Sequence, residues 1–197
     1  HPGLNNLLVQ SFDADGLEVG SVNRVVWYDN GVSQTVGGTM ATDTTWTANG
    51  GPYNLTSSLT IASGATLTIE PRTTVFLASG VNLTVANGGR LLAEGNATNR
   101  IYFMATPGSG VNWGGLIING TPGSPETRIA NAHFEGNTAT CIEVAAGTVF
   151  LDHLTFGTTT QPYLALDGAS FVVQNCTFPT ATAPLELVHG TGGIKSG

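Results

Sequence analysis

The sequence predicts an all-β protein built as a parallel β-helix, and three observations lead to this fold class. One segment repeats three times at a period of 22 residues, apolar and polar residues alternate within each repeat, and glycines separate the apolar runs. A fixed period of this length is typical of a solenoid, in which each unit buries its apolar side against its neighbours. Alternation with a period of two indicates strands rather than helices.

The 22-residue repeat is clearest between Thr127 and Thr182. Its three aligned segments are RIANAHFEG from Arg128, FLDHLTFGT from Phe150 and VVQNCTFPT from Val172. The alignment places four sets of residues on common lines: Phe134, Phe156 and Phe178; Ile129, Leu151 and Val173; Ala132, Leu154 and Cys176; and Asn131, His153 and Asn175. The three apolar lines are predicted to form the core. The polar line is predicted to lie at a corner, where its side chains bond to backbone groups or to each other.

The chain divides into three parts. Residues 1–30 predict a β-hairpin, because two strand-like runs flank the turn Asp13-Ala14-Asp15-Gly16. This hairpin resembles the last two strands of an immunoglobulin-like or fibronectin type III module, and the alternative is a cap over the first coil. Residues 31–43 are predicted to be a polar linker. Residues 44–197 predict about six to seven coils of 22–24 residues, and the lack of an amphipathic cap indicates a truncated end.

Four segments carry a resemblance to known proteins. They are WTANGGPY from Trp46, LTIEPRTTV from Leu67, LLAEG from Leu91 and WGGLI from Trp113. This succession resembles the right-handed parallel β-helix segments of large secreted, modular bacterial proteins, some of which carry immunoglobulin-like, lamin-tail or spore-coat-H-like modules. The resemblance covers residues 44 to about 190 and departs at Arg72, where such segments usually carry glycine. It implies a secreted or cell-surface location and neighbouring modules, but it brings no catalytic motif.

Composition excludes several classes of partner. Six basic residues against thirteen acidic residues give a net charge of -7, which disfavours nucleic acid because phosphate backbones require a surplus of Lys and Arg. No apolar run approaches the roughly 18 residues of a membrane span, so membrane insertion is not expected. Cys141 and Cys176 occupy different positions of the repeat, which favours free thiols over the alternative of a disulfide.

The candidate catalytic residues are Asp152, His153, Asp167, His189 and Lys195. His153 beside Asp152 is a candidate acid/base couple, although its place on the polar line also fits a corner role. Asp167 and His189 lie 22 residues apart and would stack on adjacent coils if the register held. Hydrolysis of glycosides needs paired carboxylates, and those of Asp152 and Asp167 are expected at different corners.

Sugar binding would need exposed aromatic rings, for which the candidates are Trp46, Tyr53, Trp113 and Tyr163. Packing in the core or at corners is the alternative for each ring. The Asp13 and Asp15 carboxylates in the hairpin turn are candidate calcium ligands, and a solvated turn is the alternative. No other cofactor is implied.

The sequence therefore favours an extracellular, non-catalytic β-helix module that binds a polysaccharide or cell-surface glycan, or that acts as a rigid adhesive or spacer element. The alternative is a polysaccharide lyase or glycoside hydrolase built on the same scaffold.

Overall fold

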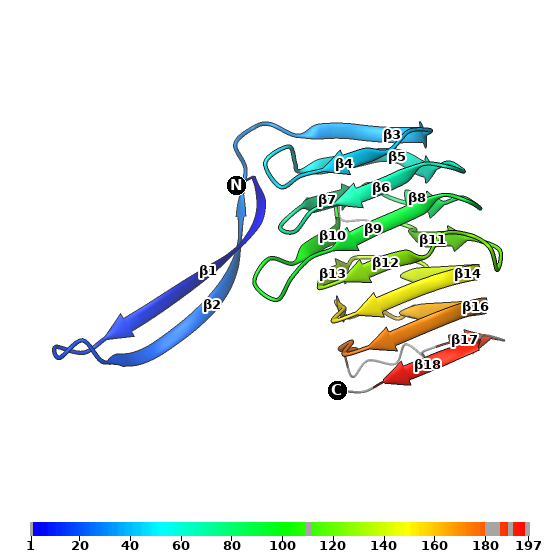
Figure 1. Cartoon of the computed structure of the whole chain (residues 1–197). Coiled ribbons are helices and arrows are strands. Elements are labelled where there is room, and N and C mark those ends of the chain that lie inside the picture. The colour runs from blue at the N-terminus through cyan, green and yellow to red at the C-terminus, as the bar shows by residue number, and fades with distance from the viewer. Residues whose placement is uncertain (1, 109–111, 180–185, 189–190, 196–197) are drawn as a thin grey trace.

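The computed structural model describes residues 2–108, 112–179, 186–188 and 191–195. These residues form a parallel β-helix of about six turns, from which a single β-hairpin projects (Figure 1). The predicted fold class is therefore confirmed. The described residues include no helix that is long and apolar enough to cross a membrane.

Each turn contributes strands to three parallel walls, named here walls A, B and C. Wall A stacks residues 34–36 of β3 (Gln34–Met40), residues 53–55 of β5 (Tyr53–Ile61), β7 (Thr74–Leu77), β10 (Ile101–Ala105), β13 (Ala132–Glu135) and β15 (Thr155–Phe156). Wall B stacks residues 38–40 of β3, residues 59–61 of β5, β8 (Asn82–Val85), β11 (Gly115–Asn119), residues 142–145 of β14 (Ile142–Asp152), residues 164–167 of β16 (Leu164–Gln174) and β17 (Glu186–Val188). Wall C stacks β4 (Thr44–Trp46), β6 (Thr66–Ile69), β9 (Arg90–Glu94), β12 (Thr127–Ala130), residues 147–152 of β14, residues 169–174 of β16 and β18 (Thr191–Lys195).

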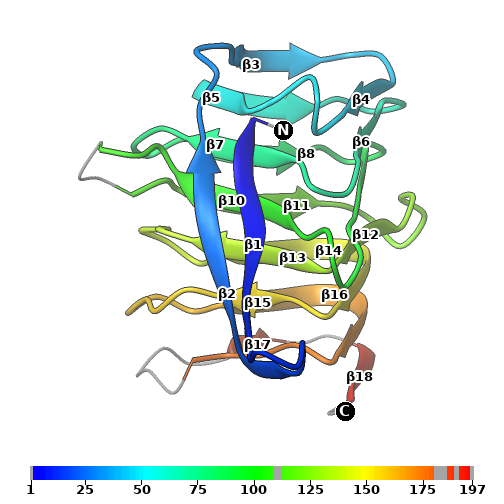
Figure 2. The same cartoon turned by 90° about the vertical axis from the view of Figure 1, so that its left-hand side faces the viewer.

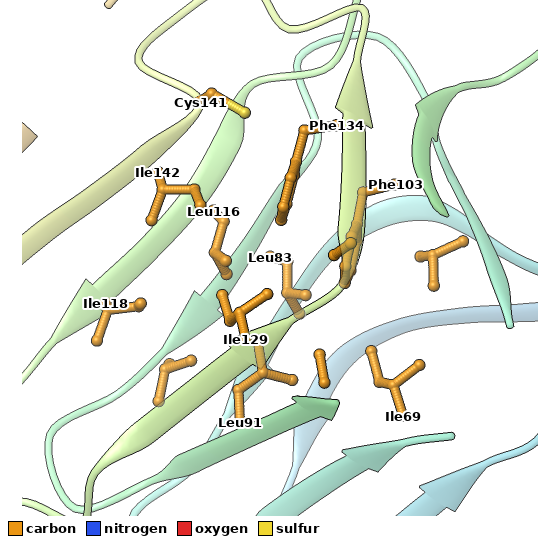
Figure 3. Close-up of a cluster of buried hydrophobic side chains, with 14 of the residues drawn as sticks. Ile69, Leu83, Leu91, Phe103, Leu116, Ile118, Ile129, Phe134, Cys141 and Ile142 are labelled. Atoms are coloured by element: carbon orange, nitrogen blue, oxygen red, sulfur yellow. The ribbon is translucent and has the colours of Figure 1, made fainter. Parts of the chain in front are cut away.

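The predicted register is confirmed in both parts of the repeat. Leu59 pairs with Leu83 in the 24-residue part, and Ile129 pairs with Leu151 in the 22-residue part. Buried side chains from all three walls meet inside the coil (Figure 3). Along wall A, four phenylalanine rings are stacked at centroid distances of 4.8, 5.7 and 5.2 Å, in the order Phe103, Phe134, Phe156 and Phe178.

The polar line lies at the corner between walls C and A, as predicted. Asn131, His153 and Asn175 adopt left-handed backbone conformations, with φ of 47°, 52° and 53°. The backbone N–H of Asn131 donates to the Asp152 carbonyl at 2.9 Å, one coil further along. This repeated left-handed residue turns the chain from one wall into the next.

The prediction of a linker at 31–43 is wrong for most of its length. Residues 34–40 form β3, which pairs in parallel with β5 and makes the first half-turn of the solenoid. Val36 and Met40 pack against the core, and the register shifts between Val36 and Gly38. The strand was missed because Gly37 and Gly38 interrupt the apolar alternation that identifies strands.

The predicted hairpin is present, but it does not cap the first coil. β1 (Gly3–Phe12) and β2 (Glu18–Tyr28) pair antiparallel and run across the strands of wall A (Figure 2). The hairpin settles there because Phe76 points outward from wall A and stacks on Trp27. Its membership of an immunoglobulin-like module stays a prediction.

Both cysteines are free thiols. Cys141 is buried, and burial raises the pKa of its thiol. Burial also raises the pKa of the Cys176 thiol, whose Sγ donates to the Gln174 carbonyl at 3.2 Å. Neither thiol is therefore expected to ionise at neutral pH.

Candidate functional site

The base of the hairpin is fixed to wall A by three contacts. The Leu4 backbone N–H donates to Thr74 Oγ1 at 2.9 Å, and the Tyr102 hydroxyl donates to Asn6 Oδ1 at 3.3 Å. The Trp27 and Phe76 rings stack at 4.6 Å. The hairpin diverges from the solenoid toward its tip (Figure 1), so the space beside its base is bounded by both parts of the molecule.

A recess of about 250 Å³ lies where the hairpin leaves wall A. It is lined by Asn6, Val25, Arg100, Tyr102, His133 and Thr155, and is called here the hairpin recess. Tyr102, His133 and Thr155 occupy equivalent outward positions on three successive coils of wall A. The recess therefore combines one apolar wall with a guanidinium, a phenol, an imidazole and a hydroxyl.

Arg100 supplies the positive charge of the recess. Its Nη1 donates to the His153 carbonyl at 3.1 Å and to Thr155 Oγ1 at 3.3 Å, which fixes the half-buried side chain against the corner. A guanidinium carries five N–H donors in a planar fork. In the described part of the chain only Nη1 is engaged, so the remaining donors are available for a carboxylate or hydroxyl ligand.

His133 is held as a neutral ring. Its Nδ1 lies 2.9 Å from Thr155 Oγ1, and its Nε2 lies 3.4 Å from Glu135 Oε2. Burial lowers the pKa of this imidazole, although Glu135 opposes the shift. Since both ring nitrogens already have partners, His133 is better placed to shape the recess than to remove a proton from a ligand.

Tyr102 joins the hairpin to the floor of the recess. Burial raises the pKa of its hydroxyl, although the hydrogen bond to Asn6 opposes the shift. The Tyr102 ring meets the His133 ring edge-on at 6.0 Å. The phenol therefore stays protonated at neutral pH and acts as a hydrogen-bond donor.

The catalytic candidates do not converge on one site. Asp152 accepts hydrogen bonds from His153 Nδ1 at 2.7 Å and from Asn175 Nδ2 at 3.0 Å. Burial acts to raise the pKa of Asp152, but these two partners outweigh it and lower the value. The couple lies at the corner between walls C and A, whereas Asp167 lies at the far end of the wall B strand.

The stacking of Asp167 with His189 does not follow from the register. Asp167 pairs with Val188, because the final repeat is one residue shorter. His189 lies outside the described residues. Lys195 pairs with Gln174, so its backbone is two coils from Asp152 at the same end of wall C.

The four aromatic candidates for sugar binding are buried. Trp46, Tyr53, Trp113 and Tyr163 have exposed fractions of 3%, 7%, 0% and 2%. Trp46 and Tyr53 stack on each other at 4.5 Å, and Tyr163 packs beside Phe156. A ring needs an exposed face to stack on a sugar, so these residues serve the core instead.

The hairpin turn uses its carboxylate internally. Asp13 Oδ1 accepts the backbone N–H groups of Asp15 and Leu17, each at 2.9 Å. Within the described ranges, no group of three or more His, Cys, Asp and Glu side chains could hold a metal ion. The solvated-turn alternative agrees with this geometry.

Sequence reasoning missed Trp27, Arg100, Tyr102 and His133 as site residues. A signal exists for two of them, because Tyr102 and His133 each precede a phenylalanine of the stacked line, Phe103 or Phe134. Residues in that position must point outward on wall A. The position of Trp27 depends on how the hairpin docks, which the repeat does not reveal.

The comparison with known families agrees with this architecture. Residues 38–148, more than half of the chain, match the model of the pectate-lyase-like β-helix domain. The chain belongs to that family. No curated protein and no solved structure matched the chain. The matched region of this pectate-lyase-like domain runs from β3 into β14, so it includes Arg100, Tyr102 and His133 but not the hairpin. Membership of the family points to a role with polysaccharides.

Proposed function

We propose that this pectate-lyase-like domain is an extracellular module that binds polysaccharide without cleaving it. The observation that carries the proposal is the hairpin recess, where Arg100 and Tyr102 present donors beside the apolar Val25. Few convergent polar groups on a partly apolar wall are typical of small-ligand sites. The partner is a polysaccharide or cell-surface glycan, with neighbouring modules on either side, and no cofactor is required.

Binding is favoured over cleavage by the state of the acid and base groups. The His133 nitrogens contact Thr155 and Glu135, and the Asp152 carboxylate is occupied by His153 and Asn175. A hydrolase needs two carboxylates flanking one bond. Asp152 and Asp167 occupy different walls, so they do not form such a pair.

A polysaccharide lyase is the second candidate. The observation that favours it is the cation of Arg100 next to Tyr102 and His133 in one recess on the outer face of a parallel wall. Removal of a proton beside a carboxyl group needs a base and a neutralising cation. In this arrangement Arg100 would be the cation, and His133 would have to release one of its present partners.

The test is retention on a panel of soluble and insoluble polysaccharides, with and without calcium, together with assays for reducing ends and unsaturated products. We expect retention of at least one glycan without product, and weaker retention of Arg100→Ala. Product that disappears in His133→Ala would overturn the binding module in favour of the enzyme. Absence of both retention and product would leave the domain as a spacer.

A further inference from the structure

A second pocket lies beside Trp27, further up wall A than the hairpin recess. Its volume is about 410 Å³, and its lining includes Trp27, Asp29, Ser33, Asn54, Phe76 and Thr106. These residues come from the hairpin, the following loop and three successive coils. This site is called here the Trp27 pocket. Its size is that of sites that hold small ligands.

Trp27 is held rigidly yet remains accessible. Its ring stacks on Phe76 with an interplanar angle of 14°, and Phe76 is only 2% exposed. The tryptophan itself is 39% exposed, unlike Trp46 and Trp113. An indole that is fixed on one side and open elsewhere loses little conformational entropy when a flat apolar surface packs on it.

Polar groups surround this indole at the pocket wall. Asp29 Oδ1 accepts the Gly31 N–H at 2.7 Å, which orients the carboxylate of Asp29. Among the residues that the structure describes, the side chains of Ser33 and Asn54 have no hydrogen-bond partner, so both can bond to a ligand. Hydroxyl, amide and carboxylate groups are suited to ligand hydroxyls, which both donate and accept.

The charge of the pocket discriminates between ligands. Asp29 is the sole ionisable side chain among its described lining residues, which include no Lys, Arg or His. An anionic ligand would therefore meet repulsion here. By contrast, the hairpin recess contains Arg100.

We propose that the Trp27 pocket binds a neutral pyranose residue, with the apolar face of the sugar against the indole and its hydroxyls bonded to Asn54, Ser33 and Asp29. The inference rests on the proposed polysaccharide-binding function and deepens it by assigning a neutral sugar unit to this pocket. A ligand held there also contacts both the hairpin and the solenoid, so it ties the two together.

The test is acrylamide quenching of tryptophan fluorescence in the presence of neutral hexasaccharides of glucose, mannose, xylose and galactose, with hexagalacturonate for comparison. The chain has three tryptophans, and Trp46 and Trp113 are buried, so quenching reports on Trp27. We expect at least one neutral hexasaccharide to reduce quenching saturably. Hexagalacturonate is expected to give no such protection.

Two variants and one control make the result specific. Trp27→Ala and Asn54→Ala should each weaken binding of the neutral hexasaccharide, measured by calorimetry, by about tenfold. Asn54 lies on the solenoid, so its variant tests the pocket without disturbing the Trp27–Phe76 contact. Tyr28→Ala is the matched control, because strand alternation points this exposed residue to the opposite face of β2.

The outcomes separate this inference from the proposed function. If a polysaccharide is retained but no neutral hexasaccharide protects Trp27, or if Asn54→Ala binds like the wild type, the pocket assignment is wrong and the module stands. If neither polysaccharide nor hexasaccharide binds, both are overturned. Protection of Trp27 that persists in Arg100→Ala supports the pocket as a site separate from the hairpin recess.

Discussion

At the scale of single residues, Arg72 holds a backbone conformation that favours glycine. Its φ is 72°, in the left-handed region, and its side chain is exposed at the start of wall A. An L-residue with a Cβ pays about 1–2 kcal/mol for this conformation. The departure from the family pattern noted at this position in the sequence therefore leaves the turn intact but strained.

Replacing Arg72 by glycine should stabilise the domain. The variant removes the Cβ strain, while the greater backbone freedom of glycine in the unfolded chain offsets part of the gain. We expect the free energy of unfolding to rise by roughly 0.5–1 kcal/mol in urea titrations. Arg72→Val is the control and should destabilise, because a β-branched residue tolerates positive φ poorly. A less stable Arg72→Gly would show that the arginine side chain contributes more than the strain costs.

His133 predicts how stability depends on pH. Burial lowers the pKa of this imidazole below its usual 6.5, with Glu135 opposing the shift and Arg100 adding to it. The unfolded chain therefore binds the proton more readily than the folded one, so stability is full above pH 6.5 and is lost as pH falls through the lowered pKa. The lowered pKa of Asp152 acts with the same sign, but below its usual 3.8.

Urea titrations between pH 8 and pH 5 measure the His133 contribution apart from that of Asp152. We expect the wild type to lose stability over this range, and His133→Gln to lose less, because glutamine does not titrate. Equal losses in the two proteins would contradict the assignment to His133.

At the scale of elements, Gly3 decides how the hairpin meets the solenoid. Its φ is 96°, and a Cβ added there would lie 2.5 Å from Thr74 Oγ1 and 2.9 Å from Thr74 Cβ. No side chain fits that space without a shift of β1 or β7. The close approach places Leu4 in hydrogen-bonding range of Thr74 and brings β2 over Phe76.

Gly3→Ala should release the hairpin from wall A while the coils stay folded. The measurement is acrylamide quenching of Trp27, which should increase, together with faster proteolysis of the hairpin. Gly16→Ala is the matched control: Gly16 also has positive φ, at 80°, but a Cβ there meets nothing within 4 Å. If both variants behave alike, the contact with Thr74 does not position the hairpin.

The element scale also explains what the sequence can and cannot predict. The 22-residue spacing predicts strands and register because every inward residue of one coil must pack on its equivalent in the next. The hairpin recess escapes this reasoning, since Tyr102 and His133 pair across 31 residues. Loops between β10 and β12 add this length, and the docking of the hairpin follows from the outward Phe76 rather than from any period.

At the scale of the whole molecule, the stacked rings of wall A join successive coils into one core. Phe156 is 6% exposed and lies between Phe134 at 5.7 Å and Phe178 at 5.2 Å. Because each coil contacts only its neighbours, a fault at this position separates the last coils from the rest.

Phe156→Asp should therefore destabilise the domain severely, by more than about 4 kcal/mol, because an unpaired charge would be buried between two rings. Phe156→Leu keeps an apolar side chain and should cost much less. Thermal melting followed by circular dichroism distinguishes the variants. An aspartate variant that melts with the wild type would show that the rings do not stack in this register.

The central claim is that polysaccharide binds at the hairpin recess of wall A and is not cleaved. Two arginine variants that remove the same charge from different faces test it. Arg100 lines the recess, whereas Arg128 lies on wall C, where it contacts Glu94, Glu126 and the ring of Phe150.

The most direct measurement is a calorimetric titration of the retained polysaccharide into the wild type, Arg100→Ala and Arg128→Ala, with reducing ends assayed afterwards. We predict about tenfold weaker binding for Arg100→Ala, as for loss of one charge-assisted hydrogen bond, unchanged binding for Arg128→Ala, and no product. Equal binding by the two variants, or product from the wild type, would contradict the account.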